Sequence, residues 1–266
     1  MDFGRDGNPF ANYVSSDVLL SLQRPGSQSA AEPAFMIMTQ VMELLFKLVH
    51  TECLRARDLL ENDDVAATLW TLRRLRYVCS VLISAWGVLG TLSPTEYGEF
   101  RDQFGQGSGF QSSMYRQLEF LLGNKDRAMA EAHRGEQAAY RDLVRTLTEP
   151  SLYDAALRLL WRRGLPVPKS AVDRDWSRPY QEEDGIVAAW RTVYLERDRY
   201  GDLYLMAEAL TDLAYDLGRW RSTHVLTAER MLGSKMGTGG TSGVNWLRRV
   251  AEQRFFPELW TVRSLL

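Results

Sequence analysis

Apolar side chains recur about every 3.6 residues through nearly every long segment of this 266-residue chain, and this period constrains its fold more than any other feature. Over residues 32–60 the stripe consists of Phe35, Met38, Met42, Leu45 and Val49, and neighbouring apolar residues widen it. We therefore expect this helix to be buried on most sides. The same period recurs over residues 64–89, 113–122, 151–163 and 182–232, whereas convincing strand alternation is absent from the sequence. The pattern predicts an all-α helical bundle.

Glycines predict where these helices end. Gly123 is placed to stop the helix over residues 113–122, and Gly164, followed by "LPVP", closes the helix before it. Gly201 and Gly218 are candidate interruptions of the 182–232 segment. The sequence shows no internal repeat, which favours a single domain.

The first 29 residues differ in composition from the rest of the chain. They are rich in Gly, Ser, Asn and Pro, apart from the apolar patch "YVSSDVLLSL". We expect residues 1–29 to form an N-terminal arm that docks elsewhere, with a neighbouring subunit as one candidate. Residues 30–266 are then the single all-α domain.

Composition argues against several classes of protein. A net charge of −2 gives no basic field for nucleic acid or an anionic membrane. We find no signal peptide and no apolar run of the roughly 18–20 residues that a spanning helix needs. The two cysteines, Cys53 and Cys79, fall in separate helical patterns, which favours a reduced, cytoplasmic protein. The eight tryptophans fit either core packing or a pocket for a flat ligand.

The three histidines have neither zinc-ligand spacing nor a partner serine in a "GxSxG" motif. His133 lies in the polar stretch "AEAHRGEQ", so we expect it to be solvated. His50, near the end of the first long helix, fits packing or a helix-end charge. His224 follows Trp220 by one helical turn, and its pattern fits either a core histidine or an axial haem ligand.

Two loops rich in small residues stand out. "GSKMGTGGTSG", residues 233–243, could bring backbone N–H groups close to an anion. It follows a helix and lacks the Lys-Ser/Thr ending of a nucleotide loop, which argues against nucleotide binding. In "SPTEYGEFRDQFGQGSGFQSSMYR", residues 93–116, Tyr97 and Arg101 lie one helical turn apart. Arg101 is either a surface arginine or a fork for a carboxylate, and spacing leaves both open.

Six motifs together carry a family resemblance. In chain order they are "EYGEFRD", "GSGFQSSMYR", "EFLLGNKD", "RWRSTH", "GSKMGTGGTSGV" and "FFPELW". The sequence resembles tryptophan 2,3-dioxygenase from about Phe10 to the C-terminal "TVRSLL". The resemblance implies an all-α protein that binds haem b and uses O2 to oxidise the C2–C3 bond of an indole ring.

The resemblance also implies how the cofactor is held. His224 matches the proximal ligand of the haem iron, with Trp220 in the turn before it. Ser108 and Gly109 match the loop over the haem, and Trp86 matches an aromatic residue of the haem pocket.

The substrate residues are carried over in the same way. Arg101 matches the arginine that binds the substrate carboxylate, and Tyr97 is its neighbour in the pocket. Thr238 matches the threonine at the amino-acid end of the substrate, and Phe35 matches the phenylalanine that packs on the indole.

The N-terminal arm belongs to the same resemblance. Phe10 and Tyr13 of "FANY" match an arm that completes the site of a neighbouring subunit, which implies a homotetramer. In this chain Phe10 replaces the first of the two tyrosines of the family's arm.

One departure concerns the substrate pocket. Thr39 stands where the family carries a histidine, one turn after Phe35 and therefore on the same helix face. A threonine hydroxyl has a shorter reach than an imidazole and leaves more space. Leu45 also replaces a family tryptophan. We expect Thr39 to alter the reaction, although the unchanged reaction at a lower rate is the alternative.

These features predict a haem-dependent oxygenase of L-tryptophan or a substituted tryptophan, such as β-methyltryptophan. The expected reaction is a tailoring step of secondary metabolism, with one oxygen atom inserted to give a 2-oxindole. The alternative is an ordinary tryptophan 2,3-dioxygenase that forms N-formylkynurenine. A haem-dependent tyrosine hydroxylase and a non-catalytic haem or tryptophan sensor are further hypotheses, which the retained motifs favour less.

Overall fold

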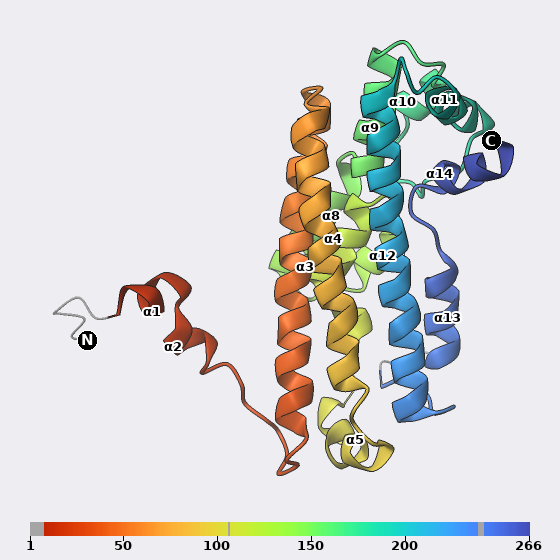
Figure 1. Cartoon of the computed structure of the whole chain (residues 1–266). Coiled ribbons are helices and arrows are strands. Elements are labelled where there is room, and N and C mark those ends of the chain that lie inside the picture. The colour runs from red at the N-terminus through yellow and green to blue at the C-terminus, as the bar shows by residue number, and fades with distance from the viewer. Residues whose placement is uncertain (1–7, 106, 239–241) are drawn as a thin grey trace.

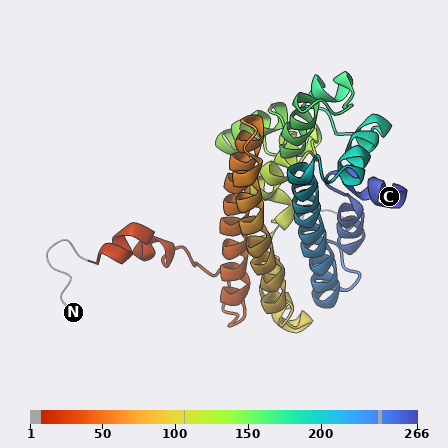
Figure 2. The same ribbon diagram turned by 45° about the horizontal axis from the view of Figure 1, so that its top comes forward.

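Three long helices form the framework of the computed structural model, which describes residues 8–105, 107–238 and 242–266. They are α3 (Glu32–Glu61), α4 (Val65–Leu89) and α12 (Gly201–Leu232), and α4 packs between the other two (Figures 1 and 2). Within the described residues every regular element is helical, so the predicted all-α fold is confirmed.

Shorter helices surround this framework. α6 and α9 pack on α3, α8 packs on α6, and α13 packs on α12. The remaining bounds are α1 (Pro9–Val14), α2 (Ser16–Leu19), α5 (Pro94–Arg101), α6 (Ser113–Leu121), α7 (Arg127–Glu131), α8 (Gln137–Thr148), α9 (Leu152–Arg162), α10 (Lys169–Val172), α11 (Asp184–Leu195), α13 (Val244–Glu252) and α14 (Pro257–Thr261). Short 3-10 turns are η1 (Asp102–Phe104), η2 (Gly109–Gln111) and η3 (Val262–Leu265).

Side-chain caps explain where several helices start. The carboxylate of Asp64 accepts a hydrogen bond from the backbone of α4, at Ala67. Ser93 and Glu96 form a capping box at the start of α5. These caps set the residue at which α4 and α5 begin, and therefore which side chains of these two helices face the core.

The helix ends and interruptions predicted from glycines are confirmed in part. Gly123 and Gly164 adopt φ angles of 101° and 79° just past the ends of α6 and α9, as predicted. Gly201 begins α12, but Gly218 lies inside it and does not interrupt it. A glycine within a helix costs only about 1 kcal/mol, and the packing of α12 against α4 outweighs that cost.

The first long helix is more exposed than its sequence predicted. Ile37, Leu44 and Leu48 of α3 point outward and are 43%, 53% and 39% exposed, so the helix is not buried on most sides. By length and composition alone α3 could also cross a membrane, contrary to the expectation from its apolar runs. In this structure it packs against α4, α6 and α9 of the bundle.

The N-terminal arm extends away from the bundle in both views (Figures 1 and 2). Phe10 and Tyr13 are 71% and 90% exposed. The base of the arm is tied to the bundle, because the Gln23 side chain donates to the side-chain oxygen of Gln40 at 2.6 Å and Ser29 donates to Glu99 at 2.6 Å. These contacts fix the point at which the arm leaves α3.

A buried lysine closes the C-terminal end of α8. Lys125 is 1% exposed, and its ammonium donates hydrogen bonds to the carbonyl oxygens of Thr146, Leu147 and Glu149, at 2.6, 3.0 and 2.6 Å. Carbonyl groups at the end of a helix lack intrahelical donors, and the helix dipole favours a cation there. This contact holds α8 against the chain that follows α6.

Replacing this lysine tests that role. Lys125→Met should lower the free energy of unfolding by about 3 kcal/mol, because buried carbonyl oxygens lose their donor. Lys169→Met is the matched control, since the Lys169 side chain is 84% exposed and, among the described residues, forms an ion pair with Asp173 alone; we expect a change below about 0.5 kcal/mol. Urea denaturation followed by circular dichroism measures both, and equal effects would contradict the assignment.

Candidate functional site

A cavity of about 530 Å³ lies among α3, α4, α5, α12, α13 and the loops around residues 107 and 237. This volume is typical of a site for a cofactor or a small ligand. The predicted site residues of the bundle all line this one cavity, namely Phe35, Thr39, Trp86, Tyr97, Arg101, Ser108, Gly109, Trp220, His224 and Thr238. Phe10 and Tyr13 do not, because the arm leads away from it.

The imidazole of His224 is held by aromatic rings at one wall of the cavity. It stacks on Trp86, with ring centroids 4.2 Å apart and an interplanar angle of 10°, and it lies 5.9 Å from the ring of Trp220. Burial lowers the pKa of His224 to about 4, so the ring is neutral near pH 7. A neutral imidazole that faces a cavity has a lone pair available for a metal ion.

The other two histidines do not line the cavity. His50 is buried within α3, and its Nε2 atom has no hydrogen-bond partner within the described residues. His133 is also buried, 5% exposed, so the expectation that it is solvated was wrong. The polar residues around it led to the wrong prediction, because the turn that follows α7 places this side chain in the interior.

Three buried donors of the cavity wall have no acceptor within the described part of the chain. They are the indole N–H groups of Trp86 and Trp220 and the Nε–H of Arg101. Buried donors are rarely left unpaired, so a group with acceptor atoms fits this cavity. Haem b is flat and largely apolar and carries two propionates, and its iron takes a neutral imidazole as ligand. The residues present therefore fit this cofactor.

Arg101 and Thr238, which also line the cavity, make contacts with the loops. Arg101 donates to the carbonyl oxygen of Met236 at 2.5 Å, and the Thr238 hydroxyl donates to the carbonyl oxygen of Gly107. Arg101 thus faces a cavity rather than bulk solvent, which favours the carboxylate fork over a surface arginine. The remainder of the glycine loop, residues 239–241, lies outside the described residues, as does residue 106.

Phe35, Tyr97 and Phe104 line the cavity as part of an aromatic cluster that also contains the buried ring of Phe100. The ring of Phe35 lies 5.7 Å from Tyr97, 5.5 Å from Phe100 and 5.1 Å from Phe104. These rings give an apolar surface next to Arg101, which suits a ligand with an aromatic body and a charged end.

The hydroxyl of Thr39 is already engaged. It donates a hydrogen bond to the carbonyl oxygen of Phe35 at 2.9 Å, as threonine often does within a helix. Its lone pairs remain free, so toward a ligand in the cavity this hydroxyl is an acceptor and no longer a donor.

Among the residues of the cavity wall that were not assigned in advance, four have ionisable side chains. They are Glu43, Tyr115, Arg116 and Arg221. Burial raises the pKa of the Glu43 carboxyl, and a hydrogen bond from Ser112 opposes this. Tyr115 and Arg116 belong to the motif "SSMYR" and Arg221 belongs to "RWRSTH". The spacing within a motif does not show which of these side chains contact one another in the fold.

Comparison with known proteins identifies relatives over nearly the whole chain. The sequence profile of tryptophan 2,3-dioxygenase matches residues 1–146 and 191–266. A tryptophan 2,3-dioxygenase of Bordetella parapertussis is 42% identical over 264 residues, covering 99% of this chain and 93% of that protein. Tryptophan 2,3-dioxygenase 1 of Ralstonia nicotianae is 40% identical, with 99% and 90% covered. A tryptophan 2,3-dioxygenase of Bacillus cereus is also 40% identical, with 98% and 94% covered.

The state of His224 can be measured in the protein prepared without added haem. Because its folded pKa of about 4 lies below the ordinary value of 6.5, the unfolded chain takes up a proton first. This histidine therefore stabilises the fold above pH 6.5, and that contribution is lost as pH falls toward 4. We expect its imidazole NMR signals, identified by their absence in His224→Gln, to stay constant between pH 5.5 and 8. A titration midpoint near 6.5 would contradict the burial argument.

Proposed function

The chain belongs to the tryptophan 2,3-dioxygenase family, and from this premise we propose that it is a tailoring enzyme with an altered outcome. Membership makes it a haem-dependent oxidoreductase that oxygenates tryptophan. The finer proposal is insertion of one oxygen atom into L-tryptophan or a substituted tryptophan such as β-methyltryptophan, giving a 2-oxindole. The observation that carries it is the state of Thr39 in the substrate pocket.

Haem b, when bound, supplies the iron that activates O2 at the indole C2–C3 bond. His224 is the residue that would hold the iron, and Trp86 and Trp220 would offer the cofactor their indole N–H groups. Ser108 and Gly109 line the same cavity from the loop after α5. We assign these five residues to cofactor binding.

The amino-acid end of the substrate meets Arg101 and Thr238. The free Nε–H of Arg101 and its guanidinium charge suit the substrate carboxylate. Phe35 and Tyr97 give the aromatic surface for the indole ring. Holding both ends of the substrate in one cavity orients the C2–C3 bond and excludes water, and such orientation supplies much of an enzyme's rate.

Thr39 acts at the indole end. Its hydroxyl donates to Phe35, so it can only accept a hydrogen bond from an indole N–H. It also reaches less far than the histidine of the family and leaves room beside the ring. The indole is then held less firmly, and a substituent at the β-carbon has space. Both effects support a changed balance between one-oxygen and two-oxygen products.

The main alternative is an ordinary tryptophan 2,3-dioxygenase, and the names of the relatives favour it. Under this alternative Thr39 slows the reaction without changing the product. Tyrosine hydroxylation and a sensor role have no comparable support, because the residues for tryptophan and haem are retained together in one cavity.

We further propose a homotetramer in the cytoplasm, in which the arm of one subunit completes the site of another. The exposed side chains of Phe10 and Tyr13, on an arm directed away from its own bundle, support this assignment. Outward apolar faces on two adjacent helices supply surface for assembly: Ile37, Leu44 and Leu48 of α3, and Trp70, Tyr77, Val81 and Val88 of α4. Nucleic acid and membranes are not proposed as partners.

Products formed under isotopically labelled O2 test the altered outcome. We expect wild-type protein to add one labelled oxygen atom to L-tryptophan or β-methyltryptophan, and Thr39→His to shift the product toward two labelled atoms with ring cleavage. Thr39→Val is the control, because it keeps the volume of threonine but removes the acceptor. Two labelled atoms in the wild-type product from both substrates would establish the ordinary dioxygenase instead.

The role of Arg101 can be isolated with a substrate that lacks the carboxylate. Arg101→Gln should lower kcat/KM for tryptophan about 100-fold, which corresponds to about 2.7 kcal/mol. With tryptamine, the wild type and the variant should be equally poor, because neither can use the arginine. Steady-state kinetics measure both, and equal losses with tryptophan and tryptamine would contradict a carboxylate contact.

A further inference from the structure

A buried carboxylate stands behind the cavity wall at the junction of α6 and α12. Glu119 of α6 is 1% exposed, and one of its oxygens accepts a hydrogen bond from Arg221 of α12 at 2.5 Å. Its other oxygen accepts from Arg116 of its own helix. Both arginines are buried and line the cavity, whereas Glu119 does not line it.

Arg221 extends this contact to a third helix. Its NH1 group donates to the carbonyl oxygens of Val250 and Gln253, at 3.4 and 3.2 Å, where α13 ends. Its Nε–H donates to the hydroxyl of Tyr115 at 2.9 Å. Carbonyl groups at a helix end lack internal donors and favour a cation. One guanidinium therefore ties α12 to both α6 and α13.

The charge balance of the cluster depends on Glu119. Two buried guanidinium cations, Arg116 and Arg221, share this single carboxylate. Removing one partner of a buried ion pair is far more costly than the net contribution of the pair, because the remaining charge is left unpaired. Without the carboxylate, the two cations would repel each other across the cavity wall.

The imidazole of His224 has few direct contacts that orient it. Within the described part of the chain its imidazole makes no hydrogen bond, and its ring contacts are with Trp86 and Trp220. Its direction is therefore set by these rings and by the helix that carries it. Arg221 lies three residues before His224 on α12, and Trp220, the residue before Arg221, packs on Tyr115 with ring centroids 5.2 Å apart. The same turn of α12 is thus held by charge and by packing.

We propose that Glu119 is a positioning residue for His224: its carboxylate holds Arg221, and Arg221 fixes the turn of α12 that directs the imidazole into the cavity. The inference rests on the proposed role of His224 as the haem ligand. Outer contacts of this kind typically change the affinity of a metal site by 10–100-fold when they are removed. Glu119 would act through Arg221 without touching cofactor or substrate.

The test uses the haem-loaded protein. We expect Glu119→Gln to release haem to an excess of a haem-scavenging globin roughly 10–100 times faster than the wild type. In the ferrous protein, the iron–histidine stretching band in resonance Raman spectra should shift or broaden. Glu119→Asp, which keeps the charge but is shorter, should lie between the two. An unchanged band together with unchanged haem release in Glu119→Gln would overturn the proposal.

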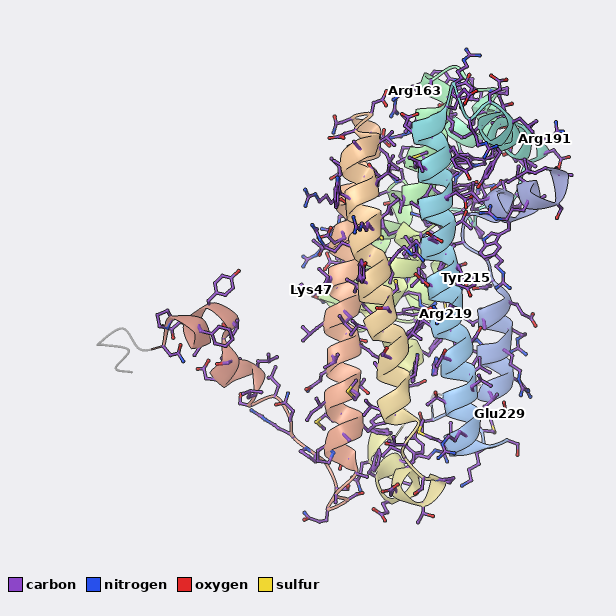
Figure 3. The ribbon with its side chains drawn as sticks, in the orientation of Figure 1. Lys47, Arg163, Arg191, Tyr215, Arg219 and Glu229 are labelled. Carbon is purple, nitrogen blue, oxygen red and sulfur yellow. The ribbon has the colours of Figure 1, made fainter. Side chains whose placement is uncertain are left out.

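Glu229→Gln is the matched control. Glu229 lies on the surface of α12 (Figure 3), where its carboxylate accepts from Arg248 of α13 at 2.7 Å. It joins the same two helices as Arg221, but about half of its side chain is exposed. We expect no change in the band or in haem release. If Glu229→Gln changed the band and haem release as much as Glu119→Gln, the loss of any contact between α12 and α13 would have this effect. That result would overturn the specific role of Glu119.

The double variant Arg116→Met/Glu119→Gln separates positioning from folding. It removes one cation with the anion, so the net charge of the cluster is restored and the thermal midpoint should recover toward the wild type. The iron–histidine band should remain altered, because Arg221 still lacks its carboxylate. Recovery of both the thermal midpoint and the iron–histidine band would overturn the proposal.

The variant His224→Ala tests the premise that His224 is the haem ligand. If the iron–histidine band persists in that variant, His224 is not the ligand and the proposed function fails, whatever the result for Glu119.

Discussion

The stacking of the His224 imidazole on the ring of Trp86 joins the two halves of the site. Trp86 comes from the last turns of α4 and His224 from the second half of α12, so the contact depends on the close packing of these two helices. It also keeps the imidazole away from water, and desolvation then holds its pKa near 4. A neutral ring that faces an apolar cavity is a ready ligand for iron. The pairing of α4 with α12 therefore determines both the fold and the chemistry available to it.

The polar groups of the cavity are few and lie in separate places. Arg101 and Thr238 are associated with the glycine loop, while Arg116 and Arg221 are held by Glu119 behind the wall. Between them the surface is largely aromatic. A low local dielectric strengthens each polar contact that is made there and penalises each that is missed. Such a cavity selects a ligand with a flat aromatic body and a charged end, which describes a tryptophan more closely than a general apolar ligand.

The sequence was sufficient where an apolar stripe coincides with a local start or stop signal, as with Asp64 before α4 and Gly164 after α9. Predictions from the sequence were wrong where tertiary contacts decide the conformation or the burial of a residue. Gly218 stays helical because α12 packs on α4, and His133 is buried although its neighbours in the chain are polar. The pairing of Glu119 with Arg221 joins residues 102 positions apart, and no spacing rule connects such a pair. Family resemblance named the residues of the cavity, but only the fold brings them into one volume.

The substrate contacts proposed here replace contacts that the protein makes with itself. Arg101 bonds to Met236 and Thr238 bonds to Gly107, so a substrate carboxylate or ammonium has to compete with backbone carbonyl groups. The charged pair of Arg101 with a carboxylate is stronger than its bond to a neutral carbonyl group, so the amino-acid end still gains from the exchange. Orientation of the indole ring depends on the other end, where Phe35 gives a surface and Thr39 gives one acceptor. A substitution at position 39 therefore acts where the site has the fewest alternative contacts, and for this reason the change of outcome that we propose is assigned to Thr39 and not to the loop.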